Sequence, residues 1–157
     1  MNRLLGLLAL CTLVAGCGGS IVDGGLTATA PSSGHEQQHG QGPPAAYLTV
    51  NGTRTRMTTG SYCWTTMSED GTGVGQCADA AGWAQIDDLP VITAADGDQV
   101  TLALGFDPTG PVQVTVGGHR MRFPAARSIT FTPHGHGLIE VFTRANGGDV
   151  DYGASIR

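Results

Sequence analysis

Two histidines separated by a single glycine come closest to a metal site in this chain of 157 residues. His134 and His136 lie in the segment 133–137, which is rich in proline and glycine and is expected to be a loop between two strands. Neutral imidazoles are common ligands of copper and zinc. Such an ion takes three or four ligands, and no local sequence supplies the others. His134 and His136 are therefore a candidate metal site, although the spacing favours a solvated turn.

Carboxylates and hydroxyl groups show no spacing that predicts catalysis. Asp149 and Asp151 alternate with apolar residues, so they would share one face of a strand, which is typical of a solvated face. The sequence contains no calcium-loop pattern and no G-x-S-x-G nucleophile motif. All eight basic residues are arginine, which excludes lysine Schiff-base chemistry. We therefore expect no enzymatic activity and no cofactor.

The charge balance bears on the kind of partner. The chain has 13 acidic and 8 basic residues, and its formal charge is −5 at pH 7. Nucleic-acid binding depends on a concentrated positive patch. Nucleic acid is therefore not an expected partner.

Three aromatic residues are candidates for ligand binding. Tyr62 and Trp64 flank Cys63 in an expected strand, so both rings point to one face and the sulfur to the other. If the rings point outward, they could form an exposed patch with Trp83 that stacks on sugars or on a protein partner. Large rings are usually buried, so the pattern favours a core position for them.

The N-terminal residues combine a basic start with an apolar run that ends at a cysteine. Arg3 precedes the run 4–15, which is shorter than the roughly twenty residues of a transmembrane helix and is typical of a secretory signal peptide. The sequence VAGC at residues 14–17 resembles the lipobox of bacterial lipoproteins. The resemblance implies a signal peptide of residues 1–16 and a lipidated Cys17 that anchors the mature chain at the cell membrane, outside the cytoplasm.

A tether and a single domain are expected after the anchor. Residues 18–44 are dominated by Gly, Ser, Thr, Pro and Gln and lack a sustained apolar period, so residues 17–44 are predicted to be a lipidated cysteine followed by a disordered tether. Residues 45–157 are predicted to form the folded domain. In an exported domain Cys63 and Cys77 are expected to form a disulfide, because only these two cysteines remain after Cys11 is removed and Cys17 is acylated.

Short alternating segments with Gly, Pro and Asp turns predict an all-β domain. Asn51-Gly52 is a strong hairpin signal, and no ten-residue stretch of the domain has helical periodicity. We expect an immunoglobulin-like antiparallel β-sandwich of about eight or nine strands, with a small β-barrel as the alternative. The loop that the expected disulfide would enclose, residues 64–76, is polar and rich in glycine, so it is not expected to hold its shape by packing. Ten segments are candidates for these strands: residues 47–50, 53–57, 61–66, 90–93, 99–106, 112–116, 120–123, 128–132, 138–143 and 150–156.

Three short sequences carry a second resemblance. They are GSYCW at 60–64, QCAD at 76–79 and GGDVDYGASI at 147–156. Together they resemble a family of secreted and lipid-anchored bacterial domains to which no activity is assigned. The resemblance implies an immunoglobulin-like fold and no particular chemistry.

The sequence thus predicts a lipid-anchored lipoprotein that displays a non-enzymatic β-sandwich for binding or for a structural role. Its expected partners are the membrane, through the N-terminal lipid, and an envelope protein or glycan. Two alternatives stay open: a copper- or zinc-handling lipoprotein that uses His134 and His136, and a carbohydrate-binding module that uses exposed aromatic rings.

Overall fold

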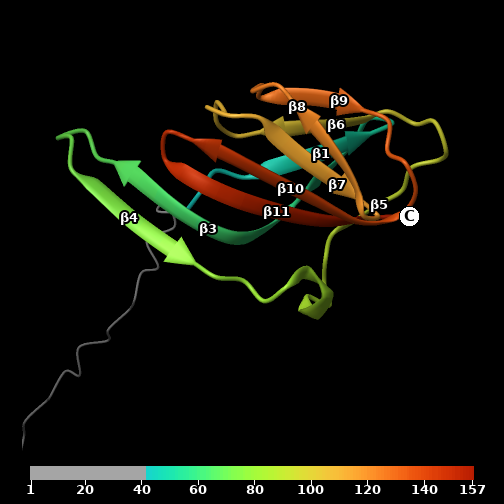
Figure 1. Ribbon diagram of the computed structural model, residues 1–157, viewed down its shortest axis with the longest axis horizontal. Helices are drawn as coiled ribbons and strands as arrows, with labels where there is room; N and C mark the ends of the chain where they lie inside the picture. Colours follow the sequence, from blue (N-terminus) through green and yellow to red (C-terminus); the bar gives the residue numbers. More distant parts are fainter. Residues whose placement is uncertain (1–41) are drawn as a thin grey trace, which may run out of the picture. The chain divides into compact units, whose positions relative to one another are not determined.

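The computed structural model of the chain describes residues 42–157, which form two packed β-sheets (Figure 1). The predicted signal peptide, Cys17 and nearly all of the predicted tether lie outside the described residues. Among residues 42–157, no helix is long and apolar enough to cross a membrane.

The sheets have four and seven strands. The four-stranded sheet has the order β2 (Thr53–Arg56), β1 (Ala46–Val50), β6 (Val100–Leu104) and β9 (Ser128–Phe131). The main path of the seven-stranded sheet is β4 (Gly73–Ala78), β3 (Thr58–Met67), β11 (Gly148–Ile156), β10 (Gly137–Ala145), β7 (Val112–Val116) and β8 (His119–Phe123). The short β5 (Val91–Ile92) pairs with the end of β11 in parallel, and all other pairs are antiparallel. The architecture is a β-sandwich, as predicted, and not the alternative barrel.

Turn chemistry sets the register of the hairpins. Asn51 and Gly52 have φ angles of 49° and 79°, which asparagine and glycine tolerate better than other residues. They connect β1 to β2 so that Val50 lies opposite Thr53. The predicted hairpin at Asn51-Gly52 is confirmed.

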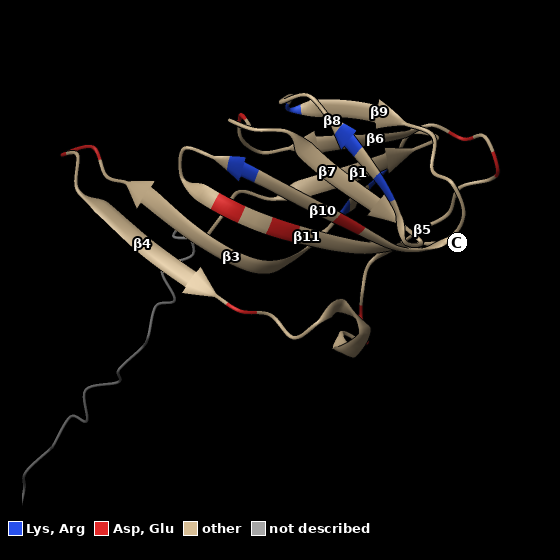
Figure 2. Cartoon of the chain, in the orientation of Figure 1, with Lys and Arg blue, Asp and Glu red and all other residues tan. Residues whose placement is uncertain are grey.

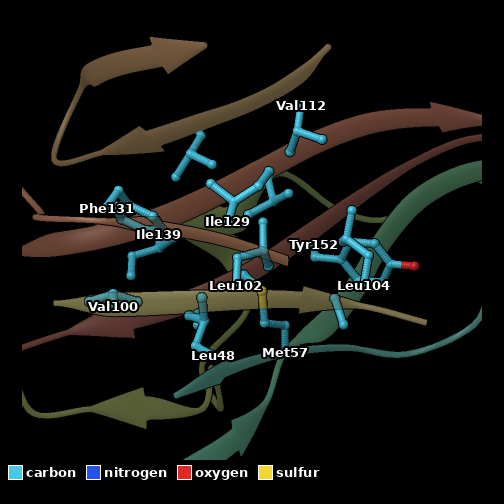
Figure 3. Packing of buried hydrophobic residues seen from close by; sticks show 14 of the residues in the cluster. Leu48, Met57, Val100, Leu102, Leu104, Val112, Ile129, Phe131, Ile139 and Tyr152 are labelled. Atoms are coloured by element: carbon cyan, nitrogen blue, oxygen red, sulfur yellow. The ribbon is translucent and has the colours of Figure 1, made fainter. Parts of the chain in front are cut away.

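Apolar side chains at every second position of the strands fill the space between the sheets. In β7 the three valines are fully buried, whereas Gln113 and Thr115 face outward. Buried residues of β1, β6 and β9 meet those of β7, β10 and β11 in one apolar cluster, which Figure 3 shows from close by. Tyr152 is fully buried in this cluster, and its hydroxyl donates a hydrogen bond to the carbonyl of Pro44. The cluster joins both sheets across residues 46–156, so the described part of the chain has a core of its own and is expected to fold alone.

Residues 42–157 contain eleven strands rather than eight or nine. The main difference is β4, which occupies part of the segment predicted to be a polar loop. All of its residues except Ala78 are exposed, so packing does not hold it. Backbone pairing with β3 from Tyr62 to Met67 holds it instead. A strand supported in this way has no apolar pattern that the sequence could reveal.

Candidate functional site

Two of the three aromatic candidates belong to the core. Trp64 is only 8% exposed, and its ring centroid lies 5.1 Å from that of Phe106. Tyr62 is partly buried and packs against the same cluster. The core position that the pattern favoured for Tyr62 and Trp64 is the observed one, and the alternative of an exposed patch formed by Tyr62, Trp64 and Trp83 is excluded.

Cys63 takes the opposite face of β3, where it forms a disulfide with Cys77 of β4. The two cysteines are directly opposite each other in the antiparallel pair, with their Cα atoms 4.0 Å apart. Both residues are exposed, so the bridge lies on the outer face of the seven-stranded sheet. It links the edge strand to the body.

His134 and His136 are exposed in the loop before β10. The Nε2 atom of His136 lies 3.9 Å from Oδ1 of Asp96, which is itself fully exposed. Within residues 42–157, no group of three His, Cys, Asp or Glu side chains is placed so that it could hold a metal ion. Only His136 gains a carboxylate neighbour, so residues 42–157 do not assemble the three or four ligands that a zinc or copper ion takes.

The outer face of the seven-stranded sheet brings polar and aromatic side chains together. Paired residues of antiparallel strands point to the same face, so the register places the outward side chains in rows across β11, β10, β7 and β8. One row consists of Asp151, Phe142, Gln113 and Arg122. The neighbouring row consists of Gly153, Glu140, Thr115 and Arg120. With strands about 4.8 Å apart, each row spans roughly 14 Å.

Trp83 completes the second row from outside the sheet. It begins the short 3-10 helix η1 (Trp83–Gln85), and its six-membered ring lies against Gly60 of β3 and Gly153 of β11. A Cβ atom at Gly153 would come within 2.4 Å of this ring, and one at Gly60 within 2.6 Å. Only glycine at these two positions leaves room for the indole. Trp83 therefore takes the place in the second row that Gly153 leaves empty.

These side chains line two hollows that share Gln113 and Phe142, and we call them together the outer-face groove. The first has a volume of about 260 Å³ and is lined by Trp83, Gln113, Thr115, Arg120, Glu140, Phe142 and Asp151. The second has a volume of about 340 Å³ and is lined by Thr109, Gly110, Pro111, Gln113, Arg122, Phe142 and Arg144. The groove is open, and side chains of three classes lie along it: aromatic rings, carboxylates and guanidinium groups.

The charges in the groove are partly separated by strand, although Arg144 shares β10 with Glu140. The carboxylates stand on β10 and β11, and the guanidinium groups of Arg120 and Arg122 stand on the edge strand β8 (Figure 2). Asp151 is half-buried, and this burial raises the pKa of its carboxyl above the usual 3.8. The negative charges of Glu140 and Asp149 raise the pKa further. Asp151 is thus the carboxylate of the groove that is least well solvated.

Of the aromatic residues that line the groove, Trp83 was named as a candidate from the sequence and Phe142 was not. Asp149 and Asp151 do share an outward face, as predicted, and Val150 and Tyr152 are buried behind it. Phe142 carried the one available signal, because it is an aromatic residue at an outward position of β10, between the buried Val141 and Thr143. The remaining groove residues become neighbours only through the pairing of strands that are distant in sequence.

Comparison with known proteins gives no relative for this chain: no family model, no curated protein and no solved structure matches it.

Proposed function

We propose that this chain is a lipid-anchored extracytoplasmic protein whose β-sandwich binds carbohydrate in the outer-face groove without transforming it. The observation that carries the binding proposal is the groove itself, in which Trp83 and Phe142 stand among outward carboxylate, amide, hydroxyl and guanidinium groups. The two packed sheets are also compatible with the immunoglobulin-like arrangement expected from the sequence.

The mixture of side chains suits a sugar better than it suits other small ligands. A pyranose ring has an apolar C–H face that packs on an aromatic ring, and hydroxyl groups around its rim that both donate and accept hydrogen bonds. Glu140 and Asp151 supply acceptors, Arg120 supplies donors, and Gln113 supplies both. The length of the rows, roughly 14 Å, accommodates more than one sugar ring.

The charge of the groove favours a neutral ligand. The lining of its two hollows contains two carboxylates and three guanidinium groups, so neither sign dominates. A polyanion would be repelled by Glu140 and Asp151, and a polycation by the arginines. A neutral glycan is repelled by neither group. Its hydroxyl groups can accept hydrogen bonds from the arginines and donate hydrogen bonds to the carboxylates.

The anchor is the second part of the proposal. The sequence VAGC at residues 14–17 supports attachment of lipid to Cys17, and two buried acyl chains hold a protein stably on a membrane. The residues after Cys17 would hold the domain off the bilayer, so that the groove can reach envelope glycans.

The test of carbohydrate binding uses residues 42–157 on an array that covers the common hexoses and N-acetylhexosamines. Positive glycans are then titrated by calorimetry and by tryptophan fluorescence. The chain has two tryptophans, of which Trp83 lies at the groove and Trp64 in the core, so a ligand should change the emission of Trp83 alone. We expect binding without release of shorter products.

Phe142→Ala should weaken binding by up to about tenfold, since stacking of this kind contributes roughly 0.5–1.5 kcal/mol. Tyr47→Ala is the matched control, because Tyr47 is an outward aromatic residue of the opposite sheet and, like Phe142, lies close to an arginine guanidinium group. Binding that survives Phe142→Ala unchanged, or an array without any positive glycan, would contradict the proposal.

A further inference from the structure

The edges of the two sheets differ in how they are protected against pairing with other strands. The edge strands of the four-stranded sheet are β2 and β9, and those of the seven-stranded sheet are β4 and β8. Arginines stand on β2 and β8, and β9 has only 4 residues. The arginines of β2 and β8 repel a further basic edge, and a short strand offers few backbone groups for pairing. β4 has 6 residues, GVGQCA, with no charge and no proline, so it has neither protection.

The backbone of β4 has hydrogen-bonding groups free at this edge. At the hairpin tip the N–H of Ser68 donates to the carbonyl of Thr72. Bonding alternates along an antiparallel pair, so residues 74, 76 and 78 bond to β3 and residues 73, 75 and 77 point away from it. Thr65, opposite Gly75, agrees with this pattern, because its N–H donates to Gly147 on the other side. Gly73, Gly75 and Cys77 therefore direct their N–H and C=O groups outward.

The same hairpin exposes apolar side chains. Among the described residues, three large apolar side chains are exposed, and two of them are Met67 at 64% and Val74 at 40% in the hairpin of β3 and β4. The disulfide between Cys63 and Cys77 fixes β4 against β3, so the free edge is held in strand conformation. Figure 1 shows β4 at the margin of the seven-stranded sheet.

Charges near each edge select its partner. Glu69 and Asp70 stand at the tip before β4, and Asp79 follows its end, whereas β8 carries Arg120 and Arg122 (Figure 2). Antiparallel pairing of β4 with a second β4 would bring Asp70 near Asp79 of the other copy, and pairing of two β8 strands would bring arginines together. Both arrangements bring like charges together, whereas β4 against β8 joins an edge flanked by carboxylates to an edge that carries arginines.

We propose that β4 pairs with β8 of a second copy of this chain, so that their seven-stranded sheets join end to end. Val74 alternates with the outward Cys77 and so faces the inner side of the sheet, as does Met121 of β8, which lies opposite the buried Val114. Pairing would shelter Val74 beside Met121. Because β4 and β8 are opposite ends of one sheet, the contact is head to tail, and it continues into a chain or closes into a ring.

Proline at Gly75 tests the edge directly. It removes an outward N–H of β4 while the bonds between β4 and β3 stay intact, and proline is tolerated on edge strands in this orientation. Gly75→Ala is the matched control: its Cβ meets only the Thr65 hydroxyl oxygen at 3.5 Å, an ordinary contact, and the N–H remains. Near-unchanged thermal midpoints of both variants would show that the fold is kept.

Sedimentation velocity of residues 42–157 at increasing concentrations should show reversible assembly in the wild type and in Gly75→Ala. Gly75→Pro should weaken it about tenfold or more, the effect of losing one or two edge hydrogen bonds. High salt should also weaken it, because the pairing joins opposite charges. A monomer at every soluble concentration, or assembly that Gly75→Pro leaves unchanged, would overturn the proposal.

Hydrogen exchange of the assembled form identifies the partner of β4. The proposal requires new amide protection in both β4 and β8. Protection in β4 without β8 would show that β4 pairs with itself and would refute the assignment. The longer chain 18–157 provides a further check: if it is monomeric while β4 is protected, the segment 18–41 covers the edge, and the second copy is excluded.

Discussion

Asp151 illustrates how a single residue of the groove is tuned by its neighbours. Its carboxyl is half-buried on the outer face, opposite Phe142, with Glu140 and Asp149 nearby. Burial and these two negative charges disfavour the ionised form, so the pKa of the carboxyl rises above 3.8 in the folded state. Above that folded-state pKa, the ionised carboxylate of Asp151 lowers the free energy of unfolding, because the charge is less well solvated in the folded protein than in the unfolded chain. As the pH falls toward 3.8, both states become protonated and this effect disappears.

Asp151→Asn is therefore expected to stabilise the domain at pH 7, since the neutral amide avoids burying a charge. The gain should shrink as the pH falls through the folded-state pKa and vanish below 3.8, where the wild-type carboxyl is neutral in both states. Urea unfolding of both proteins between pH 3 and pH 7 measures this difference. Asp79→Asn is the control, because Asp79 is exposed and is not among the charges that act on Asp151. A gain that is the same at every pH would contradict the explanation.

At the residue scale, alternation within a strand was predictable and contact between strands was not. The spacing of Tyr62, Cys63 and Trp64 correctly indicated rings on one face and sulfur on the other. Which face is buried depends on the second sheet, and the sequence could not decide that firmly. The position of Trp83 was beyond sequence reasoning, because it depends on Gly60 and Gly153, two glycines that are far apart in the chain and become neighbours only when β3 pairs with β11.

At the scale of elements, the hairpin of β3 and β4 differs from every other part of the domain. Beyond Trp64 most of its residues are exposed, so the apolar core gives it little support. Backbone pairing and the disulfide between Cys63 and Cys77 provide most of its stability. At the tip, the N–H of Thr72 donates to the Asp70 carboxylate, and this hydrogen bond lowers the pKa of Asp70.

Reduction of the disulfide should loosen β4 first and leave the sandwich folded. The cysteines are 14 residues apart, and closing a loop of this size stabilises a fold by about 3 kcal/mol in the chain-entropy model. The thermal midpoint should fall on the order of ten degrees. Hydrogen exchange should show lost protection in β4, while β10 and β11 keep theirs.

Replacing both cysteines by serine gives the control for reduction. This variant should have the midpoint of the reduced wild type and should not respond to a reducing agent. Two reactive thiols in the folded, non-reduced protein would show that Cys63 and Cys77 are not bridged, and both predictions would then fail.

Strands with one apolar face could be predicted from the sequence, whereas β4, which has no apolar face, could not. The predicted segments 112–116 and 138–143 match β7 and the central part of β10, because their buried valine and isoleucine positions recur every second residue. β4 has no such recurrence, since five of its six residues are exposed. The disulfide pairing was the clue, because two cysteines directly opposite each other require two adjacent backbone segments.

At the scale of the whole molecule, the two outer faces of the sandwich are not equivalent. The seven-stranded sheet carries the groove, the disulfide and both edges of the proposed assembly, whereas the four-stranded sheet supplies mainly the other half of the core. Joining sheets end to end would leave their outer faces uncovered, so neighbouring grooves would remain open. Several weak sugar sites held side by side would then bind a long glycan with greater avidity than one site.

The proposed anchor gives a prediction for the complete protein in its host cell. Mass spectrometry of the mature protein should find an N-terminus at Cys17 that carries acyl chains. Cys17→Ser should abolish this modification, because a hydroxyl is a much weaker nucleophile than a thiolate and cannot accept the lipid in its place. Cys11→Ser is the matched control, since Cys11 lies in the segment that is predicted to be removed, and the mature protein should be identical to wild type. Because the uncleaved signal could still hold the Cys17→Ser chain at the membrane, location alone does not answer the question. The mass of the N-terminal peptide does: an unmodified Cys17, or cleavage at another residue, would refute the anchor while leaving the groove and the edge of β4 to be judged by their own experiments.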